Sequence, residues 1–209
     1  MGTEYDLVSE ESKETIGFSA VIMKRAIVID ADSRDPLAAS PAEVIPAMTP
    51  MAPVSGGKYK PIRRTLADGT CTTGQKVVPV AETTMFAVGD VIQMVAASTP
   101  TAAASAMGTI DSIVAGVSVT LVANSSTQVD SGDIVEVAEN ALADDAVLLL
   151  SRVDLRNAEA VAVDKGAAGV IEGQCVQAAL NYCAAGGIAL TRLEVELDRM
   201  DLVPATAGS

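Results

Sequence analysis

The side chains that most often carry out chemistry in proteins are scarce or badly spaced in this chain. It has no histidine, which excludes Ser–His–Asp and Cys–His catalysis in their usual forms and also excludes histidine metal sites. Its three cysteines, Cys71, Cys175 and Cys183, fit no zinc-binding spacing. An odd number of cysteines in a chain of 209 residues is not a disulfide framework. We therefore expect small buried thiols and a reducing compartment.

Carboxylates are plentiful but form no recognisable site. The run Asp30-Ala-Asp-Ser-Arg-Asp35 suggests a calcium loop but lacks the glycine and the terminal glutamate of an EF-hand. The pair Asp144-Asp145 is typical of a solvated acidic turn. A glycosidase needs two carboxylates about 5–10 Å apart in a cleft, and the sequence singles out no such pair. We therefore predict no catalytic residue, no metal site, no cofactor and no enzyme activity.

The net charge of −13 argues against binding to nucleic acid, because phosphates must be neutralised by lysine and arginine. One basic run stands out, Lys58-Tyr-Lys-Pro-Ile-Arg-Arg64. Such a run could touch a phosphate backbone, form a solvated turn or dock on an acidic neighbour, and we favour an acidic protein partner over nucleic acid. No apolar run reaches the roughly 18 residues of a membrane span, so we predict neither nucleic acid nor membrane as a partner.

Two copies of one short sequence motif, built around Gly-Asp, lie in the middle of the chain. They are Phe86-Ala-Val-Gly-Asp-Val-Ile-Gln-Met-Val95 and Val129-Asp-Ser-Gly-Asp-Ile-Val-Glu-Val137. Glycine permits a tight bend, aspartate can hydrogen-bond the nearby backbone, and the alternation that follows is typical of a half-buried strand. The β-rich runs 108–114 and 117–122 lie between the two copies. The pattern predicts a small antiparallel β-barrel or sandwich.

Residues 1–56 have a different character. Two short apolar runs, 16–23 and 26–30, could each add a strand, and five prolines follow between positions 36 and 53. Closely spaced prolines remove backbone donors and favour extended geometry. We interpret residues 1–56 as an extended N-terminal arm that orders on a partner subunit, with a disordered tail as the alternative. Residues 57–203 are then the compact β-rich domain, and 204–209 a flexible tail.

The C-terminal third contains further strand signals. Residues 158–164 alternate as a strand does, and 169–176 form a second such run. A short helix is expected between Glu172 and Ala185, ending near Gly186-Gly187. Residues 190–198 fit a strand and a helix equally well. The predicted fold class is therefore mainly β, a compact barrel-like domain with one or two short helices.

From Phe86 to Tyr182 the order of features resembles that of bacteriophage head decoration proteins, also called capsid cement proteins. The resemblance is carried by "VGDVI" at 88–92, "SGDIVEV" at 131–137 and the block 146–180. In that block a strand ending at Val153-Asp154 precedes a loop and a second strand with the kernel Val170-Ile-Glu-Gly173. The resemblance implies a β-tulip fold and a homotrimer at threefold positions of an icosahedral shell. It also implies an N-terminal arm that completes a strand on the shell surface.

The implied function is mechanical, namely to stabilise the outer surface of a phage head against the pressure of packaged DNA. The expected partners are the major capsid protein and further copies of this chain, and the expected location is the virion, after synthesis in the host cytoplasm. Residues expected to contact the shell come from the arm and from the basic run at its junction: Ile16, Phe18, Val21, Ile27, Ile29, Lys58, Lys60, Arg63 and Arg64.

Two other interpretations remain open. A phage tail or baseplate component would use similar β-modules, and its copy number in particles would be far below that of the shell protein. A biotinyl- or lipoyl-type carrier domain also uses Gly-Asp turns, but it needs a lysine at a hairpin tip. Lys24 lies far upstream of both turns.

Overall fold

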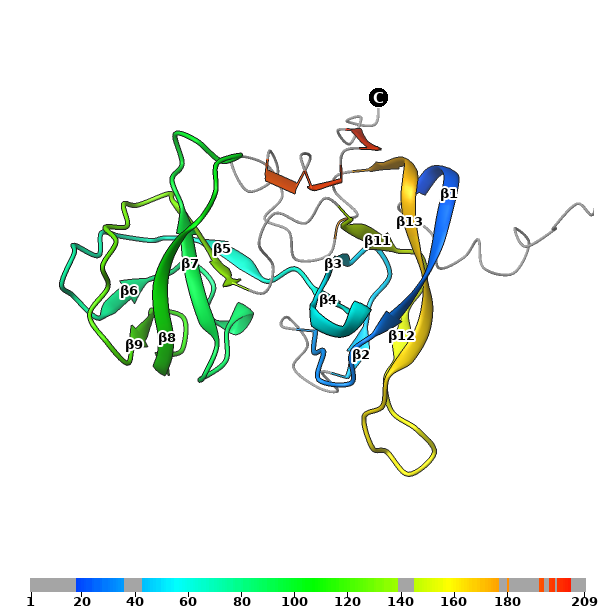
Figure 1. Cartoon of the computed structure of the whole chain (residues 1–209), viewed down its shortest axis with the longest axis horizontal. Coiled ribbons are helices and arrows are strands. Elements are labelled where there is room, and N and C mark those ends of the chain that lie inside the picture. Colours follow the sequence, from blue (N-terminus) through cyan, green and yellow to red (C-terminus); the bar gives the residue numbers. More distant parts are fainter. Residues whose placement is uncertain are drawn as a thin grey trace, which may run out of the picture.

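The computed structural model describes residues 18–35, 43–138, 145–176, 180, 192–193, 196–197 and 199–203. Within them the chain is mainly β and forms two lobes that lie side by side (Figure 1). Residues 64–137 make one, the barrel lobe, and the strands before and after them make the other, the ribbon lobe. The barrel lobe is therefore inserted into the sequence of the ribbon lobe. The mainly β, barrel-like fold predicted from the sequence is confirmed.

The barrel lobe is a closed antiparallel barrel. Its strands are β5 (Arg64–Leu66), β6 (Val77–Pro79), β7 (Val91–Val95), β8 (Ser105–Val114), β9 (Ser118–Leu121) and β10 (Ile134–Val137). They pair in the order β5-β10-β7-β8-β9-β6. A bridge between Ala67 and Val80 joins the two ends of this order, and the N–H of Ala81 donates to the carbonyl of Leu66 at 2.9 Å. Closure removes the exposed strand edges that favour aggregation.

The two Gly-Asp motifs form turns of the same kind. Gly89 and Gly132 have φ of 94° and 91°, a conformation that glycine adopts without steric cost. The carboxylate of Asp90 accepts from the N–H of Ala87 at 2.7 Å, and that of Asp133 accepts from the N–H of Asp130 at 2.8 Å. Each turn leads into a strand, and these strands, β7 and β10, pair with each other.

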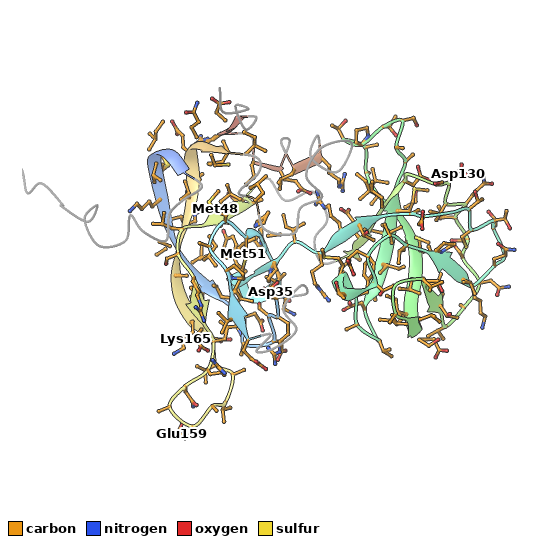
Figure 2. All side chains as sticks on the ribbon, turned by 180° about the vertical axis from the view of Figure 1, so that it is seen from behind. Asp35, Met48, Met51, Asp130, Glu159 and Lys165 are labelled. Atoms are coloured by element: carbon orange, nitrogen blue, oxygen red, sulfur yellow. The ribbon has the colours of Figure 1, made fainter. Side chains whose placement is uncertain are left out.

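The ribbon lobe is built around two long strands that pair antiparallel, β1 (Phe18–Ile29) and β13 (Lys165–Val176). Its sheet also contains β3 (Pro50–Pro53), β4 (Tyr59–Pro61), β11 (Val147–Leu149) and β14 (Met200–Val203). The short strands β2 (Val44–Ile45) and β12 (Val153–Asp154) pair separately. The lobe has its own buried residues, among them Met48 and Met51, which are labelled in Figure 2.

Only short helical segments occur in the described part of the chain. Two are 3-10 turns, η1 (Ser55–Gly57) and η2 (Thr83–Met85). Another is a helical turn near the C-terminus, where the N–H of Leu197 donates to the carbonyl of Leu193 at 2.8 Å. Residues 190–198, which the sequence left between strand and helix, are thus helical where the structure describes them.

The predicted helix over 172–185 is wrong in its first part, because β13 continues as a strand to Val176. The rest of that prediction lies largely outside the described residues. The predicted strand over 158–164 is also wrong. These residues belong to a loop between β12 and β13, where the side-chain oxygen of Asn157 accepts from the N–H groups of Glu159 and Val161 at 2.9 and 3.0 Å. Figure 2 shows Glu159 at the projecting end of this loop.

Candidate interaction surface

Of the apolar residues predicted to contact a shell, those from Phe18 to Ile29 lie on strand β1 of the ribbon lobe and not on a detached arm. Ile27 and Ile29 are 4% and 0% exposed and pack in a core cluster with Met51, Tyr59 and Leu149. Val21 is half-buried against a second cluster of the ribbon lobe. Buried side chains cannot contact a partner while the fold is intact, so the assignment of Ile27 and Ile29 to capsid binding is corrected.

The reason is a strand pairing that the local sequence does not reveal. Ten residues of β1, from Phe18 to Ile29, have register partners on β13. Residues 50–53 likewise pair with β11 and β4. Residues 18–29 and 44–53 are therefore part of the folded body, which corrects the proposed boundary of the arm at residue 56. Ile16 lies outside the described residues, and for Phe18 the structure describes only its place at the start of β1.

The basic run 58–64 is dispersed among acidic partners within the chain. The ammonium of Lys58 lies 2.9 Å from a carboxylate oxygen of Asp164 and 3.5 Å from one of Asp30. The guanidinium of Arg63 donates to both oxygens of Asp90 at 2.8 and 2.9 Å. The hydrogen bond from Lys58 lowers the pKa of Asp164. Lys58 and Arg63 are thus paired with carboxylates of the chain itself, and the acidic protein partner expected from the sequence stays a prediction.

The remaining two basic residues differ in burial. Arg64 is buried at 2% exposure on β5, where it binds Glu196, so its assignment to the shell surface is also corrected. Lys60 is half-buried on β4. Among the predicted residues whose side chains the structure describes, Ile27, Ile29 and Arg64 are buried, so these residues do not form one surface.

An exposed apolar face does occur on β1, at positions that the sequence interpretation missed. Ile22 is 70% exposed, and Met23 and Val28 are 42% and 43% exposed. The register of β1 on β13 shifts between Val21 and Lys24. Such an irregularity turns neighbouring side chains to the same side, which explains why consecutive residues are exposed. The alternation of Ile27, Val28 and Ile29 could have indicated that Val28 faces away from the other two.

Charged side chains lie between the exposed apolar positions of β1. Lys24 and Arg25 are exposed on the same strand. The guanidinium of Arg25 donates to the hydroxyl of Tyr59 at 3.1 Å and lies 3.2 Å from a carboxylate oxygen of Asp145. The candidate surface, which we call the β1 face, therefore consists of Ile22, Met23 and Val28 with these two basic neighbours. Lys24 and Arg25 lie between Met23 and Val28 along the strand, so the exposed apolar positions occur on both sides of a charged pair.

Neither a metal cluster nor a membrane-spanning helix is found in the part of the chain that the structure describes. No three cysteine, aspartate or glutamate side chains of that part are grouped so that they could hold a metal ion. None of its helices has the length and apolar character needed to cross a bilayer.

Cys71 and Cys175 are fully buried, one in the core of each lobe. Burial raises the pKa of both thiols, that of Cys175 to about 11 with a contribution from Asp201. In a Cys183→Ser variant, we expect a disulfide reagent at pH 8 to label the folded protein at least about 100-fold more slowly than the urea-unfolded protein, because the thiolate is the reactive form. Rapid labelling of the folded variant would show that the two thiols are accessible.

Comparison with protein-family models, with curated proteins and with solved structures gives no match to this chain.

Proposed function

We propose that this protein is a capsid decoration protein, which binds the outer surface of an icosahedral phage head as a homotrimer and stabilises it against internal DNA pressure. The observation that carries the proposal is the exposed β1 face, Ile22, Met23 and Val28, on the lobe that also contains the kernel Val170-Ile-Glu-Gly173. The resemblance to decoration proteins rests partly on this kernel. The binding surface and the family-like segment thus share the β1–β13 ribbon.

The order of elements in the ribbon lobe supports the same proposal. The block 146–180 supplies β11, then β12, a projecting loop, and β13. This is the sequence of strand, loop and kernel-bearing strand on which the resemblance depends. The block therefore contributes paired strands of the ribbon lobe rather than unrelated segments.

The proposed mechanism is multivalent attachment through the β1 face. Burying one large apolar side chain contributes about 1.5–3 kcal/mol at most, so one copy of the face binds weakly. In a trimer the second and third faces bind intramolecularly, and overall affinity can then exceed that of one face by about 10²–10⁴. A shell covered by such trimers would have to break many contacts before it ruptured.

Replacing Ile22 and Met23 by glutamate is the direct test. The substitutions place charges on two side chains that are apolar and buried in the proposed complex. Each loss of about 1.4 kcal/mol in binding free energy lowers the affinity tenfold. We therefore expect binding to undecorated capsids, measured by co-sedimentation, to weaken at least about 100-fold. Both side chains are exposed, so circular dichroism and the melting temperature should change little.

The control is Val117→Glu in the barrel lobe, where the valine is 58% exposed. Combined with Val122→Glu, whose valine is 55% exposed, it adds the same two negative charges to the other lobe and should leave capsid binding unchanged. Loss of binding in the control alone would move the contact to the barrel lobe. Full binding by the Ile22→Glu/Met23→Glu variant would refute the β1 face as the contact.

The copy number in purified particles separates decoration from the tail or baseplate alternative. A ratio to the major shell protein near one is the expected result. A ratio of a few per cent would place the protein in the tail or at a vertex, and its absence from particles would overturn the proposal.

A further inference from the structure

A buried cluster of four charged side chains lies where the C-terminal turn meets the barrel. Arg64, Glu136, Arg192 and Glu196 are each exposed by 2% or less. Two of them, Arg64 and Glu136, are direct cross-strand neighbours on β5 and β10, and Gln93 on β7 is the next neighbour in the same row. Val135 and Val137, on either side of Glu136, belong to the barrel core. The row of polar residues therefore lies on the outer face of the barrel.

The C-terminal turn binds this row through two side chains. The guanidinium of Arg192 donates to the two carboxylate oxygens of Glu136 at 2.7 and 3.0 Å. Its remaining terminal nitrogen donates to the carbonyls of Pro100 and Ala102 at 3.0 and 3.1 Å. The carboxylate of Glu196 accepts from Arg64 at 2.6 and 2.8 Å. The turn thus contacts three segments of the barrel lobe.

The same turn packs against the ribbon lobe through its next two side chains. Leu193 and Leu197 are 0% and 2% exposed and belong to a cluster with Leu148, Val170 and Met200. Residues four apart lie on the same face of a helical turn. Positions 192 and 196 therefore face the barrel lobe, and positions 193 and 197 face the ribbon lobe.

The apolar cores of the two lobes are separate. The cluster inside the barrel lobe contains residues between Ala67 and Val137 only. The two clusters of the ribbon lobe contain none from that range. The lobes therefore share no apolar core.

The charges of the buried cluster cancel, because it contains two arginines and two glutamates. Removing one member of a buried ion pair leaves the charge of its partner uncompensated.

We propose that the C-terminal turn that carries Arg192, Leu193, Glu196 and Leu197 is a clasp that fixes the orientation of the barrel lobe on the ribbon lobe. When the clasp opens, the barrel lobe becomes a tethered domain that remains folded. The barrel can remain folded because its hydrogen-bonded ring and its core are complete without the turn. The clasp is a conformational device of the fold, and it does not depend on the function proposed above.

The test is Arg192→Ala in the full chain, with Arg156→Ala as the matched control. Arg156 pairs with Asp154 at 2.6 Å within the ribbon lobe, so its loss should leave the lobes in place. For Arg192→Ala, small-angle scattering should show a larger radius of gyration and a second maximum in the distance distribution. Hydrogen exchange at the amide of Leu197 should accelerate at least about 100-fold, while amides of β7 and β10 keep their protection within about threefold.

Unchanged scattering and exchange in Arg192→Ala would overturn the proposal, and so would loss of protection throughout β7 and β10. If this variant does not fold, Leu193→Ala opens the clasp from its other face and should give the same scattering and exchange pattern. Failure of the barrel strands to remain protected in both variants would show that the barrel lobe does not fold independently of the turn.

Discussion

Replacing Ile29 by alanine is expected to lower the free energy of unfolding by about 2–5 kcal/mol, because the change leaves a cavity in the ribbon-lobe core. Ile29 is 0% exposed and packs with Met51, Tyr59 and Leu149. Val28→Ala is the matched control on the same strand. Val28 is 43% exposed, and its truncation should change the free energy of unfolding by no more than about 0.5 kcal/mol. Urea denaturation of the two variants measures both values.

The pair also distinguishes a structural role from a binding role. If residues 18–29 were an arm that orders only on a partner, neither substitution would alter the stability of the isolated protein, and Ile29→Ala would weaken capsid binding alone. Equal destabilisation by the two variants would contradict the orientation of β1, in which Ile29 faces the core and Val28 faces away from it.

Gly169→Ala is expected to destabilise the ribbon lobe by about 1–3 kcal/mol through overpacking. A Cβ at this position would lie 2.5 Å from Cγ2 and 2.9 Å from Cβ of Val147, whose side chain is stiff and fully buried. The strands β11 and β13 would have to separate. Gly166→Ala is the control, because a Cβ there meets no atom within 4 Å. It should be neutral or slightly stabilising, since alanine costs less chain entropy than glycine.

A second substitution tests whether contact with Val147 is the cause of this destabilisation. Val147→Ala removes Cγ1 and Cγ2, and Cγ2 is the atom nearest to the new methyl group. The Gly169→Ala/Val147→Ala protein should therefore lose less stability than the two single losses predict together. Thermal melts of the four proteins give this coupling through a double-mutant cycle. Additive losses would mean that the contact with Val147 is not what makes glycine necessary at position 169.

The sequence predicts the barrel lobe well because the signals there are local. Gly89-Asp90 and Gly132-Asp133 each contain the residue types that their turn requires, and the alternating strands follow directly. The strands β7, β8 and β9 are also close in sequence, and neighbouring strands commonly pair. Fold class and the general position of the barrel could therefore be predicted without a structure.

The ribbon lobe could not be predicted in the same way, because its pairings join distant parts of the chain. Nothing in residues 18–29 indicates that their partner is 165–176. The prolines of the region favour extended chain, but extended chain occurs both in an arm and in a strand such as β3, which begins and ends with proline. The exposed β1 face was missed for the same reason, since exposure depends on which side of the ribbon is covered.

The charged residues of the clasp illustrate a further limit. Arg64 belongs to a run of basic residues that suggests a surface, and it is buried because Glu136 and Glu196 are brought to it by distant segments. Burial raises the pKa of Glu196, while Arg64 and Arg192 oppose that rise. Periodicity identifies which residues share a face of a turn, but it does not reveal that each face meets a different lobe.

The insertion of the barrel between the strands of the ribbon also determines the order in which the chain can fold during synthesis. At about 5–20 residues per second, β1 leaves the ribosome on the order of ten seconds before β13, and the barrel can close in that interval. During this time only Ile29 at the end of the segment Phe18–Ile29 can pair, with Tyr59 on β4, and the rest of the segment, which is rich in β-branched residues, lacks its partner β13. Unpaired segments of this composition associate with one another readily. Lys24 and Arg25, in the middle of the segment, place like charges where two nascent chains would meet and so oppose that association.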